Sequence, residues 1–210
     1  MIISITGKIG SGKDTVARIW NELYPMQQWE NKKWASKLKD VASLITGIPK
    51  EKFEDQEFKH TNLGLEWATW YPNIDRPDLM SVRDLLQRLG TEAMRDGLHK
   101  NVWVNALLAD YKQYKTYNGN GDEIYRYPNW IISDTRFPNE LLAVREKGGI
   151  IIKVVRNNTT NHGAEHISET ALDDVTGWDF IIDNNGSIED LKDKINKINL
   201  EIRNNFINFM

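Results

Sequence analysis

Residues 7–15, Gly-Lys-Ile-Gly-Ser-Gly-Lys-Asp-Thr, have the types and spacing needed to bind phosphate groups. They match the pattern G-x-x-x-x-G-K and lie between a short apolar stretch and a stretch of helical periodicity. Glycines let the backbone wrap around phosphate oxygens, and N–H groups at a helix N-terminus supply partial positive charge. The alternative is a glycine-rich strand–helix turn with a chance lysine. We predict an ATP-binding loop made of Gly7, Ile9, Gly10, Ser11, Gly12, Lys13, Asp14 and Thr15.

Lys13 is the predicted catalytic lysine of this loop, because a lysine in this place reaches the outer phosphates of a nucleotide. The next residue is normally a Ser or Thr that binds Mg²⁺, but here Asp14 stands there and Thr15 follows. An aspartate serves a metal directly or through water, and as an anion it also repels phosphate. The sequence leaves open which of the two residues serves the metal.

A second acid, Asp134, follows the apolar residues 130–132. An acid at the carboxyl edge of a parallel sheet is well placed for a metal that bridges phosphates. The alternative is an acid near a helix N-terminus without a metal. We expect Mg²⁺ to be held by Asp14, Thr15 and Asp134. Arg136 comes two residues later, where a guanidinium neutralises charge during phosphoryl transfer.

The elements that must position these residues alternate along the chain. Short apolar runs predict buried strands at residues 2–6, 130–132, 149–155 and 180–182. Helical spacing predicts helices at residues 16–23, 34–45, 81–95, 99–115, 138–147 and 188–202. Ser81-Val82-Arg83-Asp84 resembles a capping box at the start of the third helix, and the last helix has an apolar stripe of Ile188, Leu191, Ile195, Ile198 and Ile202. Residues of about 50–80 lack periodicity and are interpreted as an insertion over the core. Alternating strands and helices predict an α/β fold whose parallel sheet is covered by helices on both faces.

Composition limits the classes of function. The 210 residues include 27 Lys and Arg, 30 Asp and Glu and no Cys, and the net charge is −3. This charge argues against a nucleic-acid coat or a polybasic membrane binder, and the lack of Cys excludes disulfides and thiolate chemistry. No apolar run approaches the ~18 residues of a membrane span. We expect one cytoplasmic domain, with neither a nucleic-acid polymer nor a membrane as partner.

Several short motifs resemble the deoxynucleoside monophosphate kinases of bacteriophage type, within the P-loop kinases. In chain order they are Gly12-Lys13-Asp14-Thr15, Ala35-x-x-Leu38-Lys39, Leu86-Gln87-x-x-Gly90-Thr91-Glu92-x-x-Arg95, Trp103, Asp134-Thr135-Arg136-Phe137-Pro138-Asn139-Glu140 and His166-x-Ser168-Glu169. The resemblance implies a P-loop three-layer sandwich with a sheet of about five strands and a helical or irregular substrate-binding insertion. It also implies transfer of a phosphoryl group from ATP, with Mg²⁺, to a deoxynucleoside 5′-monophosphate.

The resemblance also implies a lid at residues 157–168, which here contains no Lys or Arg. Arg156, at the base of that lid, is the remaining nearby candidate for a catalytic cation. Binding of the acceptor requires further cations and a side chain that recognises the base. For the candidates within residues 81–95, the alternative is that they simply form the solvated surface of a helix. Trp70 is either a stacking wall for a base or part of a small core. The expected substrate-binding residues are Lys39, Trp70, Arg83, Gln87, Arg95 and Glu169.

Two other functions remain open from the sequence. One is a P-loop kinase of another small acceptor, of the dephospho-coenzyme A or phosphomevalonate kind. The other is a regulatory module that binds ATP without an acceptor. This alternative stays open because Asp14 replaces the usual Ser or Thr. The sequence leaves a monomer or a homodimer open, and a phage-encoded enzyme would act in the host cytoplasm.

Overall fold

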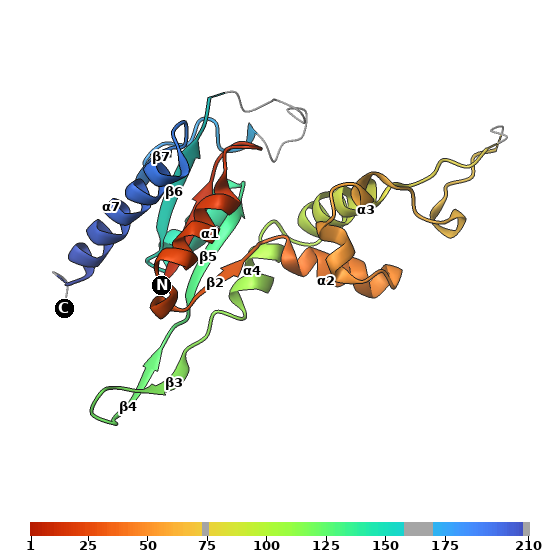
Figure 1. The fold of residues 1–210 in the computed structure, drawn as a ribbon. Coiled ribbons are helices and arrows are strands. Elements are labelled where there is room, and N and C mark those ends of the chain that lie inside the picture. The colour runs from red at the N-terminus through yellow and green to blue at the C-terminus, as the bar shows by residue number, and fades with distance from the viewer. Residues whose placement is uncertain (73–75, 158–169, 208–210) are drawn as a thin grey trace. The chain divides into compact units, whose positions relative to one another are not determined.

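The structure is a computed structural model that describes residues 1–72, 76–157 and 170–207. The chain divides into two compact units, one formed by Met1–Lys33 with Ala109–Met210 and the other by Trp34–Leu108 (Figure 1). The first unit contains the predicted phosphate-binding loop. The second contains the predicted insertion.

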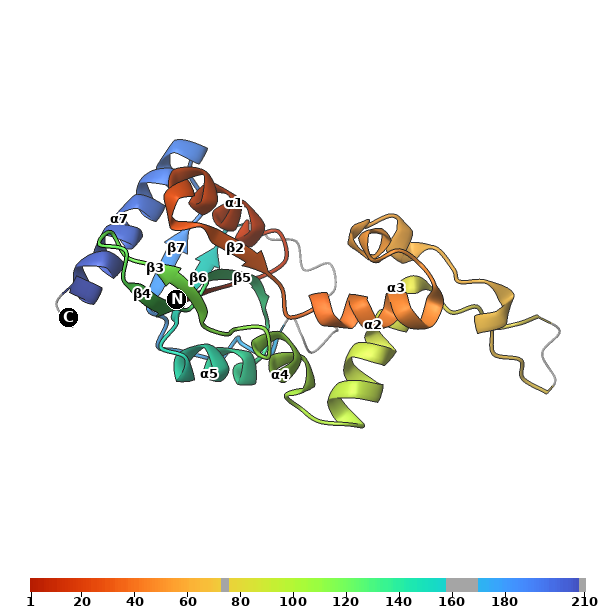
Figure 2. The same cartoon turned by 90° about the horizontal axis from the view of Figure 1, so that it is seen from below.

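The first unit is built on a parallel five-stranded sheet with the order β2-β5-β1-β6-β7. Its strands are β1 (Ile2–Thr6), β2 (Trp29–Lys32), β5 (Asn129–Thr135), β6 (Ile150–Val155) and β7 (Phe180–Asp183). Figure 2 shows helices α1 (Lys13–Leu23) and α7 (Ile188–Ile207) on one face and α5 (Pro138–Glu146) on the other. The predicted three-layer α/β sandwich is confirmed.

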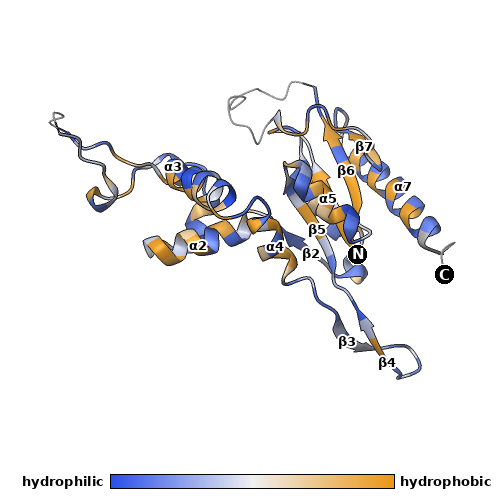
Figure 3. Ribbon diagram, turned by 180° about the vertical axis from the view of Figure 1, so that it is seen from behind, coloured by the Kyte–Doolittle hydropathy of each residue, from blue (hydrophilic) through white to orange (hydrophobic). Residues whose placement is uncertain are grey.

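The main core lies between the sheet and the two helices α1 and α7. All five residues of β1 are buried, because a central strand of a parallel sheet is covered on both faces. α7 carries alternating apolar and polar bands (Figure 3), and its buried apolar positions are Leu191, Ile195, Ile198 and Ile202. This spacing of three and four residues matches the predicted stripe, except that Ile188 at its start is exposed. None of the helices in the described ranges combines the length and apolarity that a membrane crossing requires.

A hairpin interrupts the predicted helix at residues 99–115. Helix α4 (Val102–Leu108) is followed by β3 (Tyr114–Tyr117), which pairs antiparallel with β4 (Glu123–Arg126). The prediction is therefore wrong beyond Leu108. Both strands contain β-branched and aromatic residues, which favour pairing across the turn at residues 118–122, and this pairing overrides the weak helical signal.

The second unit consists of helices around a smaller core. Its longer elements are α2 (Ser36–Thr46), α3 (Val82–Gln87), the π-helix η5 (Arg88–Asp96) and α4. The predicted insertion forms the 3-10 turns η2 (Lys50–Glu54), η3 (Phe58–His60) and η4 (Leu65–Trp67). Phe53 and Leu63 of this segment are buried together with Val82 and Leu85.

Helix α3 begins with the capping box that the sequence predicts. The Ser81 hydroxyl accepts a hydrogen bond from the Asp84 N–H, and the Asp84 carboxylate accepts one from the Ser81 N–H. These hydrogen bonds satisfy backbone donors that have no partner in the first helical turn. Hydrogen bonding to the Ser81 hydroxyl lowers the pKa of Asp84.

Candidate functional site

The phosphate-binding loop connects β1 to α1, as its pattern predicts. Gly7 has a φ of 150°, and a Cβ built there would lie 2.3 Å from the Val154 carbonyl oxygen. Gly12 has a φ of 97°, and its Cβ would lie 2.3 Å from Nδ2 of Asn184. Gly7 requires glycine because a Cβ would clash with the backbone of β6, whereas Gly12 favours glycine mainly through its positive φ, with the Asn184 side chain as a further contact.

Lys13 is the first residue of α1, and its side chain folds back over the loop. Its Nζ donates hydrogen bonds to the carbonyl oxygens of Gly7, at 2.6 Å, and Lys8, at 2.8 Å. The ammonium group is thus held at the loop by neutral acceptors. Phosphate oxygens are stronger acceptors because they are charged, so this ammonium group can exchange one set of partners for the other.

Ser11 contributes a buried hydroxyl to the same loop. The residue is 1% exposed, and its Oγ has no hydrogen-bond partner among the groups that the structure describes. Its backbone carbonyl accepts a hydrogen bond of 2.8 Å from Nδ2 of Asn184. A buried polar group without a partner is unfavourable by about 1–3 kcal/mol, so this hydroxyl is prepared for a ligand.

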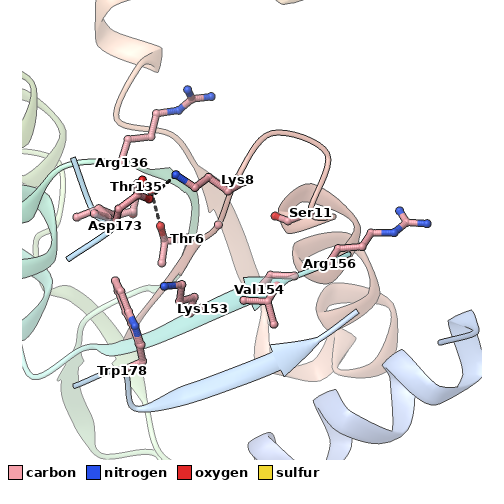
Figure 4. A pocket seen from close by; sticks show the side chains of 13 residues that line it. Thr6, Lys8, Ser11, Thr135, Arg136, Lys153, Val154, Arg156, Asp173 and Trp178 are labelled. Atoms are coloured by element: carbon pink, nitrogen blue, oxygen red, sulfur yellow. Dashed lines mark hydrogen bonds and ion pairs between the residues drawn. The ribbon is translucent and has the colours of Figure 1, made fainter. Parts of the chain in front are cut away.

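A cavity with about 600 Å³ of empty space, part of it open to solvent, adjoins the loop and the carboxyl ends of β5 and β6. Figure 4 shows Ser11 and four cationic side chains around it. The cations are Lys8, Arg136, Lys153 and Arg156. Nζ of Lys153 lies 4.9 Å from the centre of the Trp178 ring. Figure 4 shows the side chains of Arg136 and Arg156 pointing away from Lys153.

One carboxylate, that of Asp173, is among the side chains that line this cavity, and it forms an ion pair with Lys8. The pair joins the phosphate-binding loop to a segment 165 positions away in the sequence. Positive charge therefore predominates at the cavity, as binding of polyphosphate requires.

The predicted metal residues lie near the loop. Asp14 accepts a hydrogen bond of 2.7 Å from the hydroxyl of Ser133 on β5, and Nζ of Lys33 lies 3.6 Å from the same carboxylate oxygen. Thr15 and Asp134 are half-buried. β5 continues to Thr135, so Asp134 is not the last residue of the strand. These oxygen donors are of the kind that Mg²⁺ prefers.

Arg136 is held by its backbone. The buried carboxylate of Glu140 accepts hydrogen bonds from the N–H groups of Arg136, at 2.7 Å, and Phe137, at 3.0 Å. Glu140 therefore caps the start of α5 and fixes the chain on both sides of Arg136. This cap explains why a glutamate ends the Asp-Thr-Arg-Phe-Pro-Asn-Glu motif.

The predicted acceptor-binding residues belong to the second unit, apart from Glu169. Lys39 is buried and ion-paired with Glu54, while Arg83 and Trp70 are exposed. Gln87 and Arg95 are half-buried. Their roles stay predictions. Glu169 and lid residues 158–168 lie outside the described residues.

The predicted helix over residues 81–95 is present, but beyond Gln87 it continues as a π-helix, a type that the sequence does not predict. Hydrogen bonds in a π-helix join residues five apart, instead of the four of an α-helix. The Trp103 indole donates a hydrogen bond of 2.8 Å to the Gly90 carbonyl in this segment. A Cβ at Gly90 would lie 2.9 Å from Leu38, which accounts for glycine in that motif.

Sequence reasoning missed several residues of the site. Lys153, Trp178 and Asp173 line the cavity, Ser133 contacts Asp14, and Asn184 contacts the loop. A polar cluster directly after the apolar residues 180–182 is the one signal that could have identified Asn184, because strand ends meet at the active edge of a parallel sheet.

The family model and the related sequences agree with one another. A family model described as deoxynucleotide monophosphate kinase matches residues 50–195. The deoxynucleotide monophosphate kinase of Escherichia phage RB69 is 34% identical over 121 residues, which are 58% of this chain and 46% of that protein. The deoxynucleoside-5′-monophosphate kinase of Escherichia phage T5 is 27% identical over 191 residues, 70% of this chain and 72% of that protein.

The match with the RB69 protein thus spans about half of that protein's length. Among solved structures, dephospho-CoA kinase from Campylobacter jejuni is similar with 15% identity and a TM-score of 0.46, and the alignment covers 96% of each chain.

Proposed function

The chain belongs to the deoxynucleotide monophosphate kinase family, and from this premise we propose that it transfers the γ-phosphoryl group of ATP to a deoxynucleoside 5′-monophosphate. An oxygen of the acceptor phosphate forms a bond to the γ-phosphorus, while the bond between the γ-phosphorus and the bridging oxygen breaks. The products are the deoxynucleoside diphosphate and ADP.

The observation that carries this proposal is the phosphate-binding loop itself. Lys13 is hydrogen-bonded to two loop carbonyls, and the buried Ser11 hydroxyl has no partner among the described residues. When the phosphates of ATP bind, Lys13 exchanges its carbonyl partners for phosphate oxygens, and Ser11 gains an acceptor. Ser11 thereby gains a charge-assisted hydrogen bond, which is about twice as strong as a neutral one, and Lys13 exchanges neutral acceptors for charged ones.

Phosphoryl transfer needs positioning and neutralisation of charge more than it needs proton transfer. The acceptor phosphate is already an anionic nucleophile, so no general base is required. Arg136 and Arg156 extend from the ends of β5 and β6 at the cavity that contains Lys8 and Lys153. In the proposed reaction both arginines turn toward the transferred group and stabilise its charge.

The residues present fit a magnesium ion, because Asp14, Thr15 and Asp134 offer oxygen ligands beside a loop that binds phosphates. Mg²⁺ is usually held by one or two carboxylates together with substrate phosphates. When bound, it would neutralise charge on the β- and γ-phosphates.

We assign acceptor binding to the second unit and propose that residues 1–210 work as one kinase. Lys39, Trp70, Arg83, Gln87 and Arg95 are the candidate contacts there. Glu169 and the lid at residues 157–168 are further candidates from the sequence alone. We place the enzyme in the cytoplasm, which is the host cytoplasm if a phage encodes it.

An assay of ADP release tests this function. With ATP and Mg²⁺, one or more deoxynucleoside monophosphates should stimulate ADP formation strongly, and dephospho-coenzyme A and phosphomevalonate should not. Lys13→Ala should lower kcat by at least about 10²–10³-fold with an unchanged circular dichroism spectrum. Lys192→Ala removes the same charge from α7 and should retain activity. A near-normal kcat in Lys13→Ala would contradict the proposed mechanism. If no deoxynucleoside monophosphate stimulates ADP release, the proposed substrate class is wrong.

A further inference from the structure

The contact between Asp14 and Ser133 joins the loop to the neighbouring strand β5. Asp14 directly follows the loop lysine, and the Ser133 hydroxyl donates a hydrogen bond of 2.7 Å to its Oδ1. In P-loop NTPases the metal is held by a hydroxyl at the loop position after the lysine and by an acid on a nearby strand. Here Asp14, the second residue of α1, places an acid at the position after the lysine, and Ser133 places a hydroxyl on β5, next to the strand acid Asp134.

We propose that Asp14 and Ser133 form the metal site of this chain with exchanged roles, Asp14 supplying the carboxylate and Ser133 the hydroxyl. The proposal rests on the proposed function, and it assigns a role to Ser133 that the sequence does not suggest. It also explains why Asp14 is compatible with a phosphate-binding loop. A metal ion between the carboxylate and the phosphates would turn their repulsion into attraction.

The surroundings of Asp14 suit a cation. Its side chain is 75% exposed, so an ion and its water ligands have room to approach. Lys33 already places an ammonium nitrogen 3.6 Å from Oδ1, so this oxygen attracts positive charge in the nucleotide-free protein. Lys33 is itself partly exposed and can move away when a divalent cation takes its place.

The backbone of β5 accounts for the position of Ser133. β1 and β5 pair in register at Ser4 with Ile132 and at Thr6 with Thr135, so two residues of β5, Ser133 and Asp134, lie opposite one residue of β1. Such a bulge redirects side chains and is frequent beside active sites. Ser133 is only 4% exposed, so its hydroxyl is held in place beside Asp14.

Binding of Mn²⁺, measured by the loss of its free electron paramagnetic resonance signal, tests this assignment without turnover. The titration is done on the full chain with a non-hydrolysable ATP analogue. Asp14→Asn should weaken Mn²⁺ binding about 10–100-fold, and Asp134→Asn should weaken it less. Without metal, Asp14→Asn should bind the analogue up to about five-fold more tightly, because a negative charge near the phosphates is removed. A merely structural role of Asp14 would not produce these opposite shifts.

A double variant gives the sharper result. Asp14→Ser combined with Ser133→Asp restores the usual arrangement, so it should recover Mn²⁺ binding to within a few-fold of the unmodified chain. Each single substitution should bind more weakly than the pair. If the buried aspartate at position 133 prevents folding, Asp14→Asn decides the question alone, because its side chain is exposed.

Three results would overturn the assignment. They are unchanged Mn²⁺ binding in Asp14→Asn, a larger loss in Asp134→Asn than in Asp14→Asn, and a folded double variant no better than its single substitutions. The proposed function is tested separately by ADP release from the unmodified chain. If the chain releases no ADP but binds Mn²⁺ through Asp14, the assignment of the metal site stands and the proposed function is wrong.

Discussion

Replacing Ser11 with alanine should stabilise the nucleotide-free protein and weaken ATP binding. The Ser11 hydroxyl is buried without a hydrogen-bond partner among the described groups, which is unfavourable by about 1–3 kcal/mol. Some packing is lost with the oxygen, so we expect the free energy of unfolding to rise by about 1 kcal/mol. For a chain of this size that corresponds to about 2–4 °C in Tm.

ATP binding should change in the opposite direction, because the hydroxyl gains a charged acceptor when phosphate enters the loop. A hydrogen bond to a charged group contributes about 1.5–3 kcal/mol, so its loss should raise the Kd for ATP about 10–100-fold. With saturating ATP, the unmodified chain should therefore gain more stability than the variant. Thermal unfolding with and without ATP, together with calorimetric titration, measures both effects.

Ser4→Ala is the matched control. Ser4 is 0% exposed, and its hydroxyl shares a hydrogen bond of 2.7 Å with Thr135. Removing this paired hydroxyl should lower the free energy of unfolding by about 1 kcal/mol and leave the Kd for ATP unchanged. The reasoning fails if Ser11→Ala destabilises the nucleotide-free protein as Ser4→Ala does, or if it binds ATP normally.

Two further substitutions test other parts of the first unit. Gly12→Ala should lower the free energy of unfolding by about 2–4 kcal/mol, because a close contact with Asn184 is added to the unfavourable φ. Gly10→Ala has no atom within 4 Å of the new Cβ and should lower it by only about 1–2 kcal/mol. In urea unfolding, Asn184→Ala should reduce the extra destabilisation of Gly12→Ala over Gly10→Ala, and additive effects in the double variant would contradict the contact. Burial, together with the neighbouring Tyr127, raises the pKa of Tyr111 to about 12. The neutral phenol of Tyr111 therefore contributes its full share to the free energy of unfolding below pH 10, and this contribution is lost as the pH rises through 12. Tyr111→Phe should reduce this alkaline loss and remove a late tyrosinate step in absorbance at 295 nm; an unchanged late step would refute the assignment.

Local patterns account for much of the fold. The spacing of glycines and Lys13 predicts the loop, the capping box predicts the start of α3, and the apolar stripe predicts the buried side of α7. The edge strand β2 escaped prediction because it pairs on one side only, so three of its four residues are polar and two of them are exposed. The π-helix also escaped, because the sequence of η5 satisfies the same apolar periodicity as an α-helix until packing selects between them.

By itself, the sequence determined the phosphate-binding loop, the order of the main strands and helices, and the class of chemistry. These follow from rules that act between residues a few positions apart, such as helical and strand periodicity, capping and the conformational freedom of glycine. Only the tertiary structure decided that Asp14 meets Ser133, 119 positions away, and that Asn184 meets the loop, 173 positions from Ser11. Such contacts depend on the order and register of strands in the sheet, which a short sequence pattern does not encode.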